Sequence, residues 1–126
     1  ARVLVDDKEI RHATHKVDYI KNRVAFDLEW NSKDQTFDRD LNTFRAFFDY
    51  DRISVGVLVT RSNDLDPWFE SLGTFVDSTG KTRKVKAKFG ASTTHLGKLL
   101  PRLSAGRNGG CPILALGITR ALIKKD

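Results

Sequence analysis

The sequence has no methionine, even at position 1, and contains a single cysteine. One cysteine excludes an internal disulfide framework, and Cys111 is expected to be a small buried hydrophobe. The sequence contains no signal peptide and no long apolar run, which favours a soluble, cytoplasmic protein. No Cys/His spacing suggests zinc, and the stretch 106–110 lacks the Gly-Lys-Ser/Thr of a P-loop. The missing methionine indicates a processed start or a fragment of a longer protein.

Positive charge is in excess: the chain has 126 residues, a net charge of +6 and a pI near 9.7. This length suits one domain, 1–126, with one core. The charge favours a polyanion as partner and is densest over residues 81–88. A basic run of this kind is also typical of a solvated face, so charge alone leaves open a soluble domain without a nucleic-acid role.

Residues 17–30 predict a tight hairpin. From Val24 the apolar side chains alternate up to Trp30, which is the period of a half-buried strand, so Asp27 and Glu29 share the other face. The preceding run pairs back through a two-residue turn at Asn22-Arg23. In this register Asp18 faces Asp27, and Lys16 faces Glu29.

Opposed like charges, with Cβ atoms about 5 Å apart, destabilise a sheet unless something compensates them. A divalent cation such as Mg²⁺, which takes oxygen ligands, would turn the carboxylates of this hairpin into a site. The alternative is an exposed hairpin whose acids are solvated, with Lys16 and Lys21 softening the repulsion.

Two blocks of the sequence carry a family resemblance. Asp18, eight residues and then Asp27-Leu28-Glu29 resembles the active-site hairpin of PD-(D/E)xK nucleases, in the variant of the type II restriction endonucleases of the BglII, BstYI and BamHI group. The segment 88–95, leading to 109–118, is similar to the carboxyl-terminal half of BglII- and BstYI-type proteins. Asp27 stands where the family commonly has Glu, and Glu29 replaces the lysine of the wider superfamily.

The resemblance implies an α/β fold with a restriction-endonuclease-like core, in which helices flank a central mixed β-sheet. Enzymes of this group carry additional amino-terminal helical sequence, so the resemblance also implies that an amino-terminal helical portion is missing from this chain. It implies Mg²⁺-dependent hydrolysis of DNA phosphodiesters. Asp18, Asp27 and the Leu28 carbonyl would be metal ligands, and Glu29 would orient or deprotonate the attacking water. The group cuts double-stranded DNA at palindromes, many with GATC at the centre, as homodimers paired with a cognate DNA methyltransferase.

Candidates for DNA contact follow from position and charge. Three polar residues come directly after the active strand, three lysines lie in the basic run, and four polar residues lie in the second block. They are Asn31, Ser32 and Lys33; Lys84, Lys86 and Lys88; and Ser92, Thr93, Thr94 and His95. The first set is equally consistent with a plain strand exit, and hydroxyls before a helix are commonly structural caps.

The remaining pattern predicts alternating strands and helices. Val3–Val5 suggests a short strand. Thr36 or Asp38 would cap a helix carrying Leu41, Phe44, Phe47 and Phe48 as core or dimer contacts. The range 53–60 reads as a central strand covered on both faces, so that strand, helix and strand form a crossover unit.

Further along, residues 62–67 would cap a helix with Trp68, Phe69 and Leu72 on its packing side. Residues 74–87 appear least ordered by composition. A helix from Thr93 or Thr94 would end at Gly106, and a buried strand would span 111–118.

Two other functions fit the same pattern. A repair or junction nuclease of the superfamily would share the hairpin but lack sequence-specific cutting. A non-catalytic, basic DNA-binding module would bind DNA without turnover. Digestion of plasmid DNA separates the three, since they give discrete fragments, nicks or structure-dependent cuts, and no cutting.

Overall fold

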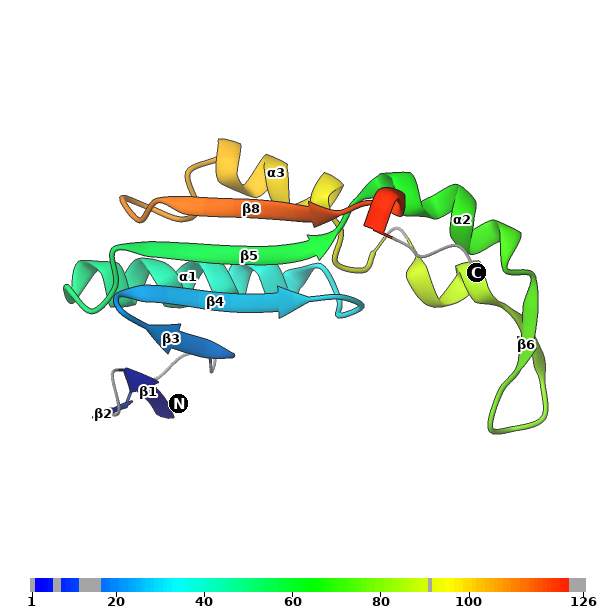
Figure 1. The fold of residues 1–126 in the computed structure, drawn as a ribbon, viewed down its shortest axis with the longest axis horizontal. Coiled ribbons are helices and arrows are strands. Elements are labelled where there is room, and N and C mark those ends of the chain that lie inside the picture. Colours follow the sequence, from blue (N-terminus) through cyan, green and yellow to red (C-terminus); the bar gives the residue numbers. More distant parts are fainter. Residues whose placement is uncertain (1, 6–7, 12–16, 91, 123–126) are drawn as a thin grey trace.

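The computed structural model describes residues 2–5, 8–11, 17–90 and 92–122, and its centre is a four-stranded mixed sheet (Figure 1). The strands lie in the order β3-β4-β5-β8. The first pair is antiparallel, and the other two pairs are parallel. Their bounds are β3 Tyr19–Lys21, β4 Val24–Glu29, β5 Val55–Arg61 and β8 Ile113–Ile118. The predicted mixed sheet flanked by helices therefore agrees with the structure.

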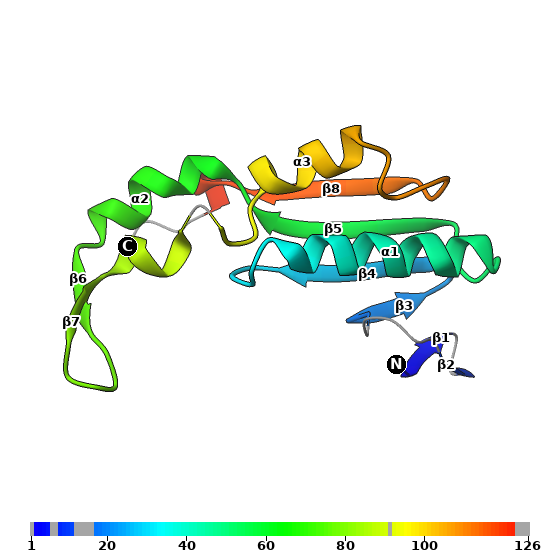
Figure 2. The ribbon, with the colours of Figure 1, turned by 180° about the vertical axis from the view of Figure 1, so that it is seen from behind.

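Smaller elements surround this sheet. Two antiparallel hairpins lie outside it: β1 Arg2–Val5 with β2 Lys8–Arg11, and β6 Thr74–Val76 with β7 Thr82–Lys84. The helices are α1 Gln35–Asp49, α2 Asp66–Ser71 and α3 Leu96–Ser104, with short 3₁₀ turns η1 Asn63–Leu65, η2 Val85–Phe89 and η3 Arg120–Leu122. The β6–β7 hairpin extends away from the sheet in both views (Figures 1 and 2).

Helix α1 connects β4 to its parallel neighbour β5, which confirms the predicted crossover unit. The helix begins at Gln35, and no side chain caps it, so the predicted caps Thr36 and Asp38 are wrong. Its apolar face packs as core, as expected: Leu41, Phe44 and Phe47 are fully buried, and Phe48 is partly buried against them. Phe37, which was not predicted, is also fully buried.

A close approach between α1 and the sheet depends on two small residues. Ala25 of β4 and Gly56 of β5 are partners in register. A Cβ atom on Gly56 would lie only 2.5 Å from Cδ2 of Phe44. The small side chains therefore leave room for the aromatic rings of α1, and the helix comes to cover this face of the sheet.

Both large helices lie on the same face of the sheet (Figure 2). Leu99 of α3 belongs to the same buried cluster as Phe44, and Ile113 and Ala115 of β8 pack against it. The opposite face exposes apolar side chains: Val24, Leu28, Trp30, Leu114 and Leu116 are 37–51% accessible. The expectation that 111–118 forms a buried strand is therefore wrong for the outer face of β8. In β5 the outward side chains of Val55, Val57 and Val59 are half-buried, so the expected cover on both faces holds only in part.

The β4 prediction was right in period and wrong in direction. The side chains alternate as expected, but Ala25, Asp27 and Glu29 are the buried set, while Val24, Leu28 and Trp30 face outward. Alternation defines two faces without saying which one a helix will cover. Here the crossover places α1 over the acidic face, so the acids are not solvated.

Other segments also differ from expectation. Residues 74–87 form the β6–β7 hairpin and most of η2. The turn is organised by Asp77, whose carboxylate accepts hydrogen bonds from Thr79 and Lys81 and pairs with Arg83. Leu72 is 45% exposed and does not pack, whereas Phe69 is buried. Cys111 is buried, as predicted.

Candidate active site

The β3–β4 hairpin positions the first acidic residues. Asn22 and Arg23 both adopt positive φ angles, of 50° and 65°, which confirms the predicted two-residue turn. Arg23 is held there by hydrogen bonds to the Ser54 hydroxyl and to Asp51. The register pairs Tyr19 with Phe26, so the next positions outward are Asp18 and Asp27, as expected. Lys16 lies outside the described residues.

Asp18 and Asp27 are connected through the backbone. The Asp18 amide donates to Oδ1 of Asp27 at 2.8 Å, and the Leu28 amide donates to Oδ2 of Asp18 at 2.9 Å. Asp18 is exposed, whereas Asp27 is fully buried. The two residues are therefore neighbours, but the Asp18 side chain is open to solvent and the Asp27 side chain is not.

The buried acidic site contains a residue that the sequence analysis missed. One carboxylate oxygen from each of Asp27, Glu29 and Asp40 can be chosen so that all three atoms lie within 4.8 Å of one another. Asp40 comes from α1 and is fully buried, and Glu29 is only 6% exposed. The sequence did carry a signal for it: Asp40 shares the helix face of Phe37, Leu41 and Phe44, where a charged residue is out of place unless it is partnered.

The environment disfavours ionisation of the two aspartates of this cluster, Asp27 and Asp40. Removal from water raises the pKa of Asp27 to about 7, although the hydrogen bond from the Asp18 amide opposes that rise. Burial, followed by the negative charge of Asp27, raises the pKa of Asp40 to about 11. Buried like charges of this kind are costly unless protons or a cation compensate them.

The donor set suits a hard divalent cation. Oδ2 of Asp27 is buried and has no hydrogen-bond partner among the described residues. The hydroxyl of Thr60, which is paired in register with Glu29, is also buried without a partner in that part of the chain. Carboxylate and hydroxyl oxygens are the ligands that Mg²⁺ prefers. The residues present therefore fit a Mg²⁺ site.

The two polar segments singled out in the sequence lie side by side. The Ser32 amide donates to the Thr94 hydroxyl at 3.1 Å, and the Thr94 amide donates to the Ser32 carbonyl at 2.7 Å. Lys33 and Thr93 form an isolated antiparallel bridge. The structure therefore brings the residues after β4 together with the segment before α3. Neither Thr93 nor Thr94 begins a helix, contrary to the sequence-based prediction. Helix α3 begins later, at Leu96, and its N-cap position has no side-chain cap.

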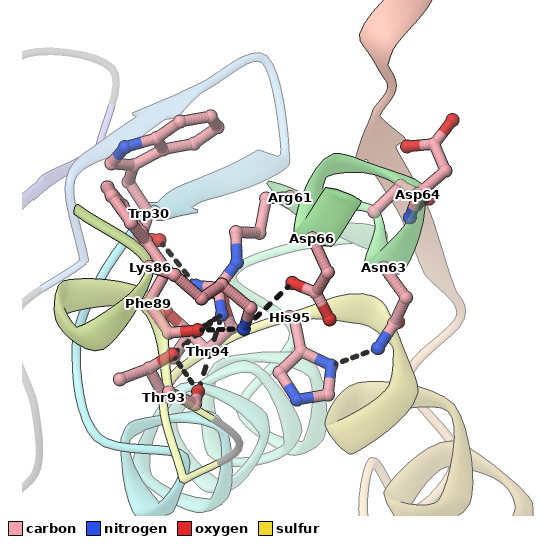
Figure 3. A network of polar contacts seen from close by, with 12 residues as sticks. Trp30, Arg61, Asn63, Asp64, Asp66, Lys86, Phe89, Thr93, Thr94 and His95 are labelled. Atoms are coloured by element: carbon pink, nitrogen blue, oxygen red, sulfur yellow. Dashed lines mark hydrogen bonds and ion pairs between the residues drawn. The ribbon is translucent and has the colours of Figure 1, made fainter. Parts of the chain in front are cut away.

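Arg61 is the residue that sequence reasoning overlooked in this region. It ends β5, is 1% exposed, and donates hydrogen bonds to main-chain carbonyls on both segments (Figure 3). Its guanidinium also contacts the rings of Phe69 and Phe89. Burial lowers the pKa of Arg61, and the charge of Asp66 opposes this. A buried arginine at the end of an apolar strand is the signal that could have identified it.

The predicted DNA-contact lysines differ in availability. Lys86 donates to the Phe89 carbonyl and pairs with Asp66 at 3.6 Å, and Lys88 lies 4.3 Å from the centre of the Phe75 ring. Lys84 and Lys33 are exposed, as are Asn31 and Ser92. His95 is nearly buried, and its Nδ1 lies 3.0 Å from Nδ2 of the Asn63 side chain.

A mixed sheet that carries buried carboxylates on a central strand under a crossover helix is compatible with the class of restriction endonucleases. Residues 2–118 match the family model described as restriction endonuclease BglII/BglIII, and the chain belongs to that family. The family implies a DNA nuclease, with DNA as its substrate. No curated protein and no solved structure matches the chain. No helix in the described ranges has the length and apolar character needed to cross a membrane.

Proposed function

We propose that this protein is a Mg²⁺-dependent type II restriction endonuclease that hydrolyses phosphodiester bonds in double-stranded DNA at a short palindromic site. The observation that carries the proposal is the buried cluster of Asp27, Glu29 and Asp40 in a chain of the BglII/BglIII family. Buried acids with raised pKa values are typical of functional sites, because they destabilise a fold that does not use them.

Each acidic residue has a proposed role. Asp27 and Asp40 would hold the cation, with Asp18 and the Leu28 carbonyl completing the ligand set from the edge of the hairpin. The cation would supply Lewis acidity, favouring ionisation of water and neutralising charge on the phosphate. Glu29 would orient the attacking water and accept its proton, because one of its carboxylate oxygens lies within 4.8 Å of oxygens of Asp27 and Asp40.

The proposed DNA-binding residues flank this site. Asn31, Ser32 and Lys33 would lie near the scissile phosphate, and the segment Ser92–His95 beside them would face the same duplex. Lys84, Lys86 and Lys88 would add positive charge along the path of the backbone. A palindromic site is read by a two-fold dimer, so we propose a homodimer acting with a cognate DNA methyltransferase in a restriction-modification system.

The test is digestion of long unmethylated DNA by the purified protein, with and without Mg²⁺. Asp27→Asn is the inactive variant, and Asp64→Asn is the matched control, because Asp64 is exposed and lies on η1. We expect discrete Mg²⁺-dependent fragments that Asp27→Asn loses and Asp64→Asn retains. Nicks or structure-dependent cuts would indicate a repair or junction nuclease, and DNA binding without turnover would indicate a binding module.

A further inference from the structure

Glu29 is held by a side chain just beyond the end of β4. The Ser32 hydroxyl donates a hydrogen bond to Oε2 of Glu29 at 3.0 Å. Because Glu29 is 6% exposed, few other conformations are open to this carboxylate once one of its oxygens is fixed. One oxygen of the Glu29 carboxylate also lies within 4.8 Å of oxygens of Asp27 and Asp40, so the Ser32 bond holds a member of the acidic cluster.

Ser32 is itself held by a segment far along the chain. Its amide and carbonyl groups are both bonded to Thr94, through the Thr94 hydroxyl and amide respectively. Two residues further on, the Asp34 amide donates to the Ser92 carbonyl at 2.9 Å. The backbone that presents the Ser32 hydroxyl therefore cannot move independently of residues 92–94.

Arg61 ties that segment to the end of β4 (Figure 3). Its guanidinium donates to the Thr94 carbonyl at 3.0 Å and to the Thr93 hydroxyl at 2.7 Å. Longer bonds reach the carbonyls of Trp30, Phe89 and Gly90, at 3.3–3.4 Å. A planar guanidinium can serve several acceptors in fixed directions, which a lysine ammonium cannot reproduce.

These contacts form a continuous chain from Arg61, through Thr94 and Ser32, to Glu29. We propose that Ser32 is a positioning residue for Glu29, and that Arg61 fixes the Thr94 segment from which Ser32 is held. The inference rests on the proposed nuclease function and deepens it. It assigns the Ser32 hydroxyl to the catalytic carboxylate, in place of the DNA contact proposed for Ser32 above. Supporting residues of this kind commonly change activity or metal affinity about 10–100-fold when they are removed.

The first experiment compares Ser32→Ala, Ser32→Thr and a control, Ser71→Ala, in steady-state DNA cleavage. Ser71 is the matched control because its side chain is exposed and its hydroxyl donates to the nearby Trp68 carbonyl, away from the acidic cluster. We expect Ser32→Ala to lower kcat about 10–100-fold with KM for DNA changed less than about 2-fold. Ser32→Thr, which keeps the hydroxyl, should restore kcat. A rise in KM alone, or an unchanged kcat, overturns the proposal.

A second measurement does not depend on cleavage. Glu29 supplies one of the three clustered carboxylate oxygens that could hold a metal ion. Calorimetric titration with Mn²⁺ alone should therefore show about 10-fold weaker binding in Ser32→Ala than in the wild type, with Ser32→Thr unchanged. If the wild type cuts no DNA, the proposed function fails, and this titration decides the inference on its own. Equal Mn²⁺ affinity in all three proteins would then refute it.

The role of Arg61 has its own readout. Arg61→Lys keeps the positive charge but loses the planar set of guanidinium donors that bind residues 93 and 94. The backbone amides of residues 92–94 should therefore exchange with deuterium faster. The value of kcat should fall as it does in Ser32→Ala. Unchanged exchange in 92–94 would contradict the part assigned to Arg61. The melting temperature of each variant shows whether it remains folded.

Discussion

Asp40 of α1 lies against Asp27 of β4 in a site from which water is excluded, since both side chains have zero accessible surface. Neither residue is placed there by the apolar pattern that builds the rest of the α1–sheet contact. Both are charged types on buried faces, and their pKa values are raised by that burial. Burial of these two aspartates therefore lowers the stability of the folded protein.

This relationship predicts how stability depends on pH. In the unfolded chain Asp27 has a pKa near 3.8 and is ionised above about pH 4. In the folded protein the Asp27 carboxyl keeps its proton up to about pH 7. The folded state binds more protons in this window, so the free energy of unfolding should fall as pH rises from about 4 to about 7. Asp40 should extend the fall to higher pH. Chemical denaturation of the metal-free protein at pH 5 and pH 8 measures the difference.

Replacing Asp40 by a side chain that needs no proton should stabilise the protein. Asp40→Asn is expected to raise the free energy of unfolding at pH 8 by about 1–2 kcal/mol, because the unfolded Asp40 carboxylate must take up a proton on folding at this pH, whereas an amide is neutral in both states. The same variant should bind Mn²⁺ more weakly. Asp64→Asn, on an exposed turn, is the control and should change neither quantity. A less stable Asp40→Asn protein at pH 8 would show that the carboxylate is compensated within the fold.

Two substitutions of Asp18 should separate its structural role in the hairpin from its proposed role as a metal ligand. Asp18→Asn keeps an oxygen that can accept from the Leu28 amide, so the hairpin should be as stable as in the wild type. Asp18→Ala loses this bond and should cost about 1 kcal/mol. If Asp18 is a metal ligand, as proposed, both variants lose Mn²⁺ affinity. An Asp18→Asn protein with wild-type Mn²⁺ affinity would restrict Asp18 to the hairpin.

Gly56 should tolerate no side chain. Gly56→Ala places a methyl group 2.5 Å from Cδ2 of Phe44 and 2.9 Å from Cδ1 of Ile113, so α1 or β8 must shift. We expect a loss of about 1–3 kcal/mol in the free energy of unfolding. Gly90→Ala is the control, since an added Cβ there meets nothing within 4 Å. Equal denaturation midpoints for the two variants would disprove the close approach.

The lysines should differ in their effect on DNA binding. Lys84 is exposed, so Lys84→Ala should weaken binding to any DNA sequence and reduce the slope of log affinity against log salt by about 1. Lys86 is engaged with Phe89 and Asp66, so Lys86→Ala should lower stability more than it lowers the salt slope. Fluorescence anisotropy at several salt concentrations, with a melting curve for each variant, checks both expectations.

Local sequence patterns predicted the local elements well. The turn at Asn22-Arg23, the crossover from β4 to β5 and the buried phenylalanines of α1 all follow from short-range periodicity and turn chemistry. The covered face of β4 could not be predicted, because it depends on where α1 packs. Asp40 was missed because a charged helix residue is usually solvated. The pairing of Ser32 with Thr94 joins segments that no local pattern relates.

The turn at Asn22-Arg23 also limits how such chains can vary in length. β4 is fixed by β5 and α1, so one residue added to the turn would leave Asp27 in place. It would shift β3 by one position and move Asp18 to the opposite face of its strand, away from the Leu28 amide. Relatives that keep this site should therefore preserve eight residues between the two aspartates. Insertions should collect in turns such as 77–81, in the β6–β7 hairpin that extends away from the sheet (Figure 1).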